Sequence, residues 1–284
     1  MIRHLLLVFV SFAPLSQAEP LTLRVVAANL TSDNRQTYSP DNGNHSNPEG
    51  AGARILTALK PDIVCIQEFN TSIPTRRWVN STFGKEFHFF REGTKGIPNG
   101  IISRYPIIES GLWDDPMLEN REFAWARIRL PENREVWVAS VHFHSKGADS
   151  RSKESAALLA SLREHVPKDA MIVLGGDLNT RTTEEPCFRI LKRAFVIPRQ
   201  PPHDQNGIIF TNSPRNRPYD WVLASKPLDQ LSTPVIVAEQ EFPHGLVFDT
   251  RVFTPMEKLS PARKSDSAHK MMQHMAVIRD FRFP

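Results

Sequence analysis

Hydrophobic and polar positions alternate in blocks along the chain, and these blocks predict strands separated by helices and turns. Apolar residues at helical spacing predict helices at residues 50–60, 151–166 and 184–193. Short apolar runs bounded by polar, proline or glycine residues predict strands at 21–28, 63–67, 87–90, 100–103, 107–113, 123–130, 136–141, 171–174, 207–211, 219–224 and 275–283. Two blocks of strand–helix–strand pattern indicate an α/β fold with two mixed β-sheets packed face to face, a four-layer α/β/β/α sandwich.

The segment 171–180 (MIVLGGDLNT) is the centre of this pattern. Its unbroken apolar run, 171–174, is typical of a strand buried on both faces. Gly175 and Gly176 permit a tight turn and a close approach of the backbone. Asp177 and Asn179 follow at i and i+2, so on an extended chain their side chains point the same way. The pair fits either a site at a strand end or an ordinary turn that caps the next helix.

Residues 1–18 have the pattern of a cleavable signal peptide. Arg3 provides the positive start, 5–10 are apolar, and Ser16-Gln17-Ala18 is a small-x-small cleavage sequence. The apolar run is shorter than the roughly 20 residues that span a bilayer. We therefore expect a secreted or periplasmic, monomeric protein without a transmembrane segment, in which residues 19–284 form one domain.

Charge and cysteine content add little to this picture. The chain has 35 Lys and Arg against 31 Asp and Glu, a net charge of +4. These basic residues are scattered, so charge suits a phosphate-bearing substrate without indicating nucleic acid. Cys65 lies in the apolar run 63–66, which favours a buried free thiol over a disulfide with Cys187.

Polar residues stand at the ends of several predicted strands, and their order along the chain is distinctive. They are Asn29, Gln67-Glu68, the segment 102–107 (ISRYPI), Val141-His142, the segment 176–179 (GDLN), the segment 219–223 (YDWVL) and His274. Over about residues 21–283 this ordered set resembles the endonuclease/exonuclease/phosphatase superfamily. That superfamily includes deoxyribonuclease I, apurinic-site endonucleases, bacterial sphingomyelinases and inositol-polyphosphate 5-phosphatases.

The resemblance implies a metal site at two of the strand ends. Glu68 would be the main ligand of Mg²⁺ or Mn²⁺, with assistance from Asn29, because hard cations prefer oxygen ligands. From the residue alone, Glu68 also fits a salt-bridge partner of Arg or Lys. In the family an Asp precedes the final His, whereas here Gln273 precedes His274. Gln273 keeps an acceptor oxygen and loses the charge.

Two alternatives exist for the aspartate that Gln273 replaces. Asp266 could fold back to replace the missing carboxylate, or Ser265-Asp266 could be the motif itself, with His269 as its histidine. We favour His274, because the apolar run that follows it predicts the final strand.

The resemblance also implies catalytic roles. Asp177 would position or deprotonate the attacking water, and Asn179 would donate to the phosphate. His274 would contact a phosphate oxygen or share the proton transfer, with Asp220 holding its ring. His142 would stabilise developing negative charge, and His144 would line the substrate cleft. His142 and His144 could instead bind zinc, but two ligands make an incomplete site.

These expectations describe an exported, divalent-metal-dependent phosphodiesterase, with DNA or RNA as the leading substrate. One alternative is a sphingomyelinase-like or other phospholipid phosphodiesterase, or a phosphatase. Such an enzyme could use an exposed aromatic hairpin, although the candidate residues also suit a core: Trp78, Phe83, Phe87, Phe89 and Phe90. The other alternative is a catalytically silent phosphate-binding module.

Overall fold

A computed structural model describes residues 20–31, 50–71, 73–93, 96–268 and 271–284. The expected signal peptide lies outside the described residues, as does nearly all of the polar segment 31–47. Among the described residues, no helix is long and apolar enough to cross a membrane.

The first sheet has seven strands in the order β10-β14-β1-β2-β4-β3, with β13 also paired to β14. Its central pair, β1 and β2, is parallel, and its other pairs are antiparallel. The strands are β1 (Thr22–Asn29), β2 (Ile63–Gln67), β3 (His88–Arg91), β4 (Gly100–Ser103), β10 (Ser232–Thr233), β13 (Leu246–Phe248) and β14 (Ala276–Arg282).

The second sheet has five strands in the order β5-β6-β7-β8-β9. Here too one central pair is parallel, β7 with β8. The strands are β5 (Ile107–Trp113), β6 (Phe123–Arg129), β7 (Glu135–His142), β8 (Ile172–Asp177) and β9 (Asp220–Ala224). A separate two-stranded sheet pairs β11 (Val235–Val237) with β12 (Gln240–Phe242).

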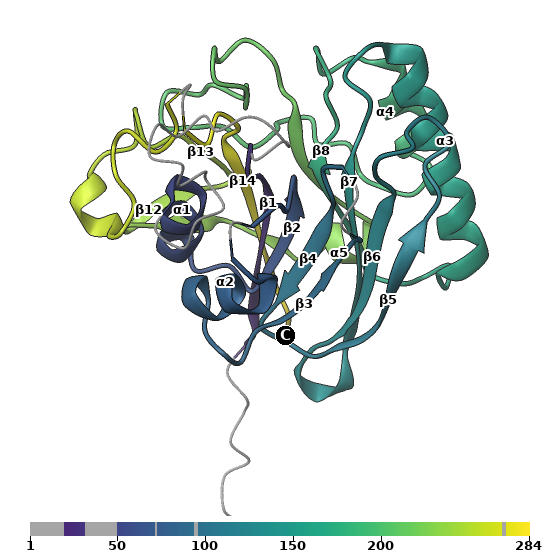
Figure 1. The fold of residues 1–284 in the computed structure, drawn as a ribbon, viewed down its shortest axis with the longest axis horizontal. Helices are drawn as coiled ribbons and strands as arrows, with labels where there is room; N and C mark the ends of the chain where they lie inside the picture. The colour runs from purple at the N-terminus through teal and green to yellow at the C-terminus, as the bar shows by residue number, and fades with distance from the viewer. Residues whose placement is uncertain (1–19, 32–49, 72, 94–95, 269–270) are drawn as a thin grey trace, which may run out of the picture.

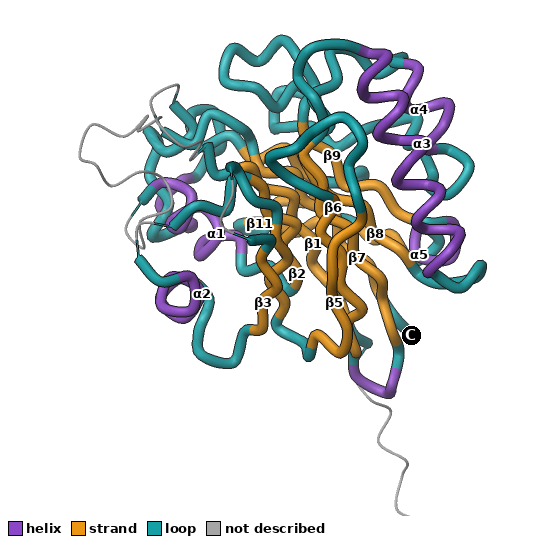
Figure 2. Tube along the Cα trace, turned by 45° about the vertical axis from the view of Figure 1, so that its right-hand side comes forward, coloured by secondary structure: helices purple, strands orange, loops and turns teal. Residues whose placement is uncertain are grey.

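Helices cover the outer faces of both sheets, as Figures 1 and 2 show. The helices α1 (Ala51–Leu59) and α2 (Thr75–Thr82) lie on the first sheet, and α3 (Ala148–His165) and α4 (Pro186–Leu191) lie on the second. The short α5 (Lys226–Asp229) follows β9, and two 3₁₀ turns occupy Pro131–Asn133 and Met256–Leu259. The four-layer α/β/β/α prediction is therefore confirmed.

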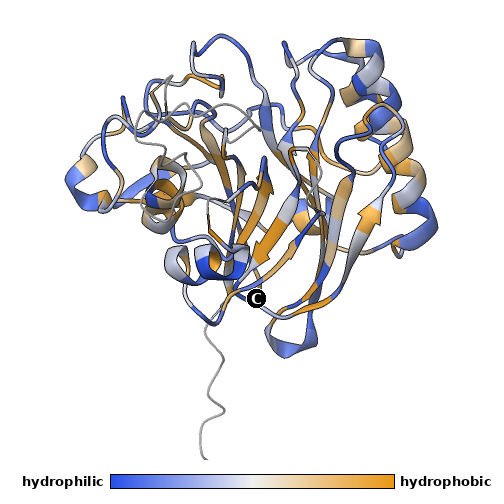
Figure 3. Cartoon of the chain, in the orientation of Figure 1, coloured by the Kyte–Doolittle hydropathy of each residue, from blue (hydrophilic) through white to orange (hydrophobic). Residues whose placement is uncertain are grey.

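Three apolar clusters separate these layers. One fills the space between the sheets, for example Val25 of β1, Cys65 of β2 and Val173 of β8. The other two lie between each sheet and its helices. In Figure 3 the hydrophobic colour concentrates on the strands, and the loops are mainly hydrophilic. Cys65 and Cys187 are both buried free thiols, which confirms the preference against a disulfide.

The two glycines of the central segment are needed for different contacts. A Cβ on Gly175 would lie 2.5 Å from Cys65 Sγ in the facing sheet. A Cβ on Gly176, whose φ is 155°, would lie 2.0 Å from the backbone oxygen of Val141 in the neighbouring strand. Gly175 therefore lets the two sheets approach each other directly behind the ends of their central strands.

Several predicted elements differ from the structure. The strand predicted at 207–211 is wrong: the side chain of Asp204 accepts from the backbone N–H of Asn206 and Ile208 in a turn, Gly207 has a φ of 78°, and the chain to residue 211 is irregular. The helix α2 was not predicted, because its segment is mostly polar and only Trp78, Val79 and Thr82 are buried. The short strands β10 to β13 lie where the sequence has frequent prolines and no clear period.

We predict that Gly175→Ala lowers the free energy of unfolding by about 1–3 kcal/mol, because the added methyl group overpacks the space between the sheets. Adding Cys65→Gly should recover part of this loss, since the two sites share one contact and their effects should not add. Denaturant unfolding measures both. Gly147→Ala is the matched control, because a Cβ there meets no atom within 4 Å. Equal losses for Gly175→Ala and Gly147→Ala would contradict the account.

Candidate active site

The site residues lie where the central strands of both sheets end. Asn29 pairs with Gln67 at the ends of the parallel strands β1 and β2, and Glu68 follows directly. In the other sheet His142 pairs with Asp177 at the ends of β7 and β8, and Asp177 pairs with Asp220 at the start of β9. Because parallel strands end at the same edge of a sheet, this topology gathers the polar ends into one cluster.

The backbone leaves these strands in an unusual way. Thr31, Glu68 and Asn179 all have positive φ, at 55°, 52° and 51° respectively. Such left-handed conformations cost free energy for residues with a side chain, and they concentrate at functional sites. Each of the three residues follows within two residues of a strand end. The turns therefore redirect the chain immediately after the last strand hydrogen bonds.

Asn29 connects the two sheets at the site. Its amide Nδ2 donates to Glu68 Oε1 and to Asp177 Oδ2, each at 3.1 Å. Its carbonyl Oδ1 accepts from the backbone N–H of Thr31 at 2.8 Å. Asn29 is fully buried. It therefore presents N–H groups to the two carboxylates, and it would assist a metal chiefly by orienting Glu68.

Asp220 and His274 form an ion pair beside Asp177. His274 Nδ1 lies 2.9 Å from Asp220 Oδ2 and 3.8 Å from Asp177 Oδ2. Burial by itself would lower the pKa of His274, but the charges of Asp220 and Asp177 and the hydrogen bond to Asp220 outweigh it and raise that pKa to about 10. His274 is therefore an imidazolium at neutral pH, able to donate a proton.

His142 has the opposite electrostatic environment. Burial, with the positive charges of Arg121 and His274, lowers the pKa of His142 well below its usual value. Its Nε2 lies 3.3 Å from Asp177 Oδ2, and its Nδ1 has no hydrogen-bond partner among the described residues. His142 is thus a neutral ring next to an imidazolium, so the two histidines differ in charge although they adjoin the same carboxylate.

Asn179 is fixed by the turn after β8. Its backbone N–H donates to Asp177 Oδ1 at 2.8 Å, and its Nδ2 donates to the backbone oxygen of Phe143 at 2.8 Å. The expectation that Asp177 and Asn179 point the same way on an extended chain is wrong, because the chain becomes left-handed at Asn179. The second N–H of its Nδ2 remains available to a ligand.

His144 lies in the loop after β7, at a different place from the cluster. Its backbone N–H donates to Glu154 Oε1 at 2.6 Å, and its ring Nδ1 accepts from the backbone N–H of Lys146 at 2.9 Å. Among the described residues, the one group of three possible ligands within 4.8 Å of one another contains Asp177, Asp220 and His274. The alternative of zinc held by His142 and His144 thus gains no support.

In the segment before β14, Gln273 and Asp266 have different partners. The backbone N–H of Gln273 donates to Thr31 Oγ1 at 3.2 Å, which ties it to the end of β1. Asp266 is fully buried, forms a 2.5 Å ion pair with Arg54 of α1 and accepts from the backbone N–H of Arg263. His269, the other candidate, lies outside the described residues.

The donor set fits a hard divalent cation. Glu68, Asp177 and Asp220 bring three buried carboxylates into one cluster. Burial raises the pKa of Asp177, and the charges of Asp220 and Glu68 raise it further while His274 opposes them. A bound cation would offset this repulsion. Because His274 is protonated and bonded to Asp220, we favour the carboxylate oxygens of Glu68 and Asp177 as ligands over the ring of His274.

Two features of the site were not predicted from the sequence. The guanidinium of buried Arg121 donates from Nε to the backbone oxygen of His142 at 2.6 Å and from Nη2 to that of Phe143 at 3.3 Å. The ring of Tyr219 lies 5.8 Å from that of His274, and its hydroxyl accepts from Arg217 at 3.3 Å. Arg121 comes from an irregular loop, where no periodicity could have indicated it. Tyr219 could have been found, since it directly precedes Asp220.

Comparisons with solved structures agree with this fold. An endonuclease/exonuclease/phosphatase from Beutenbergia cavernae aligns with 92% of this chain and 72% of its own at 16% identity and a TM-score of 0.62. A humanized D. rerio TDP2 aligns over 92% of this chain and 98% of its own, with 16% identity and a TM-score of 0.60. Staphylococcus aureus beta toxin aligns over 90% of this chain and 99% of its own, with 13% identity and a TM-score of 0.57. At these identities the likeness shows the fold alone.

The sequence itself identifies the family. No curated protein sequence shows significant similarity to the chain. A model of the endonuclease/exonuclease/phosphatase family, however, matches residues 42–260, well over half of the chain. The matched region contains Glu68, His142, Asp177, Asn179 and Asp220. The chain therefore belongs to the endonuclease/exonuclease/phosphatase family.

Proposed function

We propose that this protein is a divalent-metal-dependent phosphodiesterase that hydrolyses nucleic acid. The observation that carries the proposal is the buried cluster in which Asp177 contacts both the Asp220–His274 ion pair and the Asn29–Glu68 pair. A phosphodiester is an anionic, unreactive ester. Its hydrolysis needs a positioned water, neutralisation of charge on phosphate and a proton for the leaving group.

The residues of the cluster can supply these functions separately. Asp177, whose pKa burial raises above the ordinary carboxyl range, would orient or deprotonate the attacking water. His274 is held protonated by Asp220 and would donate to a phosphate or leaving-group oxygen. Neutral His142 and the free N–H of Asn179 would donate to developing negative charge. Glu68 and Asp177, which Asn29 orients, would hold Mg²⁺ or Mn²⁺. The bound cation would supply Lewis-acid stabilisation of the phosphate.

Nucleic acid is favoured over lipid by what lies on the surface. Of the aromatic residues considered for a lipid-binding hairpin, Trp78 and Phe87 are buried in the core around α2. Phe83 and Phe89 are partly buried against that core, and Phe90 is half-buried. Among the described residues, the large apolar side chains that are exposed are Ile208, Ile236 and Val252. Tyr219 with Arg217 beside His274 provides a ring and a cation, which suit a base and a phosphate.

Export and the monomeric state also belong to the proposal. Export rests on the signal-like pattern of residues 1–18. Beyond this, the net charge of +4 is compatible with a polyanionic substrate.

The first prediction concerns metal and substrate. Hydrolysis of bis-p-nitrophenyl phosphate should stop in EDTA and return with Mg²⁺ or Mn²⁺. Glu68→Gln should raise the Mg²⁺ concentration for half-maximal rate by about 10–100-fold or more, because it removes an anionic ligand. Glu164→Gln, an exposed change on α3, is the control.

The same assay should compare plasmid DNA, RNA, sphingomyelin and a sugar phosphate. Turnover of DNA or RNA well above the others is expected. Preference for sphingomyelin or for a phosphomonoester would replace the proposed substrate and leave the metal chemistry intact. Full activity in EDTA by metal-free protein would contradict the metal assignment, and no activity on any ester would favour a binding module.

The second prediction concerns the Asp220–His274 pair. Asp220→Asn and His274→Ala should each lower kcat by about 10²–10⁴-fold, and the double variant should be little worse than His274→Ala, because the residues act as a unit. Since Asp220 raises the pKa of His274, Asp220→Asn should also move the high-pH fall in kcat/KM to lower pH. If the kcat losses of the two single variants multiply in the double variant, and the high-pH fall in kcat/KM does not move in Asp220→Asn, the two residues do not act as a pair.

The third prediction separates Gln273 from Asp266. Gln273→Asp should lower the Mg²⁺ requirement, because it adds a negative charge next to His274. Asp266→Asn should leave the Mg²⁺ titration unchanged and cost about 3 kcal/mol of stability, since it breaks the buried ion pair with Arg54. Thermal unfolding and Mg²⁺ titrations below the melting temperature measure these effects. Loss of metal-dependent activity in folded Asp266→Asn, with no effect of Gln273→Asp, would make Asp266 the ligand.

A further inference from the structure

A second pocket lies on the outer side of the five-stranded sheet, at the opposite edge from the active site. It has a volume of about 690 Å³ and is formed by the end of α3, the loop before β8, the turn after α4 and the start of α5. Asp177 ends β8 in the active site, whereas Ile172 at the start of β8 lines this pocket. Five steps along a strand place the two about 17 Å apart. The pocket is therefore a separate site.

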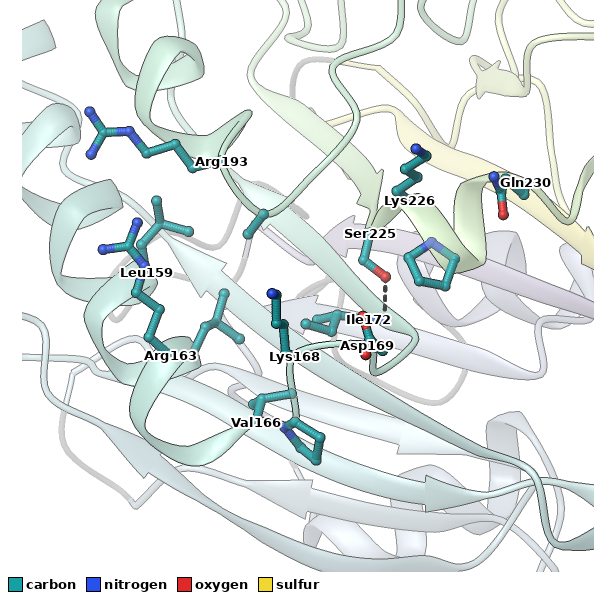
Figure 4. Close-up of a pocket in the computed structure, with 14 residues that line it drawn as sticks. Leu159, Arg163, Val166, Lys168, Asp169, Ile172, Arg193, Ser225, Lys226 and Gln230 are labelled. Carbon is teal, nitrogen blue, oxygen red and sulfur yellow. Dashed lines mark hydrogen bonds between the residues drawn. The ribbon is translucent and has the colours of Figure 1, made fainter.

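The floor of the pocket is apolar and firmly built. Leu159, Leu162 and Val166 of the α3 end face Ile172 of β8, and all four are buried. The buried Ser225 fixes the wall, since its hydroxyl accepts from the backbone N–H of Ile172 at 2.9 Å and donates to the oxygen of Ala170 at 3.1 Å. Figure 4 shows Ser225 and Ile172 joined in this way beneath the side chains of the rim.

The rim is strongly cationic. Arg163, Lys168, Arg193 and Lys226 line the pocket and come from four different segments, as Figure 4 shows. All four are exposed, and none forms an ion pair with another described residue. The one acidic residue of the lining is Asp169, which leaves an excess of three positive charges. Elsewhere in the described chain many arginines are ion-paired with carboxylates, for example Arg24, Arg151 and Arg215.

From this combination we propose that the pocket binds an amphiphilic anion, a molecule with an apolar chain or ring and one carboxylate or phosphate group. The apolar floor would cover the hydrophobic part, and the rim cations would neutralise the acidic group. The volume lies within the roughly 300–1,000 Å³ of small-molecule sites. An anion bound at the rim would form charge-assisted hydrogen bonds with these cations. This inference does not depend on the proposed phosphodiesterase activity.

The test is calorimetric titration of the full-length protein with four probes: decanoate, decyl phosphate, decanol and inorganic phosphate. Binding of decanoate or decyl phosphate is expected to be at least about tenfold tighter than binding of decanol or of inorganic phosphate, because only the amphiphilic anions use both the floor and the rim. The relative affinities for decanoate and decyl phosphate, which differ in their head group, distinguish a carboxylate site from a phosphate site. Salt at 0.5 M should weaken the favoured interaction through screening.

Charge-reversal variants locate the binding. Arg163→Glu combined with Lys168→Glu should weaken binding of the amphiphilic anion by about tenfold, the scale expected for two partly exposed ion pairs. Lys192→Glu is the matched control, since this exposed lysine directly precedes Arg193 and does not line the pocket. Both variants should fold, and their diesterase rate should stay unchanged, because these side chains are exposed and remote from Asp177.

Three results would overturn the proposal. Decanol binding as tightly as decanoate and decyl phosphate would show a merely apolar cavity. An equal loss of binding in Lys192→Glu and in the double variant would show attraction to general surface charge. No measurable binding of either amphiphilic anion up to millimolar concentration would remove the site altogether, and it would leave the phosphodiesterase assay unaffected.

Discussion

The structure depends on placing several carboxylates where the two sheets meet. Burying a carboxylate without a partner is costly, and here Glu68, Asp177 and Asp220 are all buried at one edge. The amide of Asn29 donates to Glu68 and Asp177, and the imidazolium of His274 lies beside Asp177 and Asp220. Arg121 adds a nearby positive charge. This partial compensation keeps the cluster folded and leaves an excess of negative charge that a divalent cation can neutralise.

The sheets are built to bring these groups together. Each has a single parallel pair near its centre, so Asn29 and Glu68 end one pair while His142 and Asp177 end the other. Gln67 donates to Ser140 Oγ at 2.9 Å, and Ser140 donates to the oxygen of Ile66, which joins the sheets just behind the site. Gly175 permits this close approach. Side chains from two sheets can then share hydrogen bonds within about 3 Å, a precision that catalysis requires.

The sequence was informative where function sits on regular structure. Apolar runs that end in Glu68, His142 and Asp177, and one that follows Asp220, predicted both the strands and the polar residues at their ends, because a run of apolar residues is typical of a buried strand. Irregular segments gave no such signal. Arg121 reaches the site through a single long side chain, and residues 207–211 are irregular chain after a turn in which the side chain of Asp204 accepts two backbone N–H groups. The ion pair of Asp266 with Arg54 joins residues too far apart in sequence for any pattern to connect.

The position of Gln273 shows how the family's carboxylate could be lost without losing the site. The backbone of Gln273 is bonded to Thr31, whose own N–H is bonded to Asn29, and this chain of contacts uses no side-chain charge at position 273. Any residue with a backbone N–H, and so any except proline, could maintain it. An aspartate there would add a negative charge at the residue before His274, whose pKa Asp177 and Asp220 already raise. A neutral glutamine lowers the electrostatic cost of the metal-free site and, by the same argument, lowers its affinity for a cation. If Gln273 is the counterpart of the family's aspartate, as we propose, the glutamine would therefore exchange metal affinity for stability of the metal-free cluster.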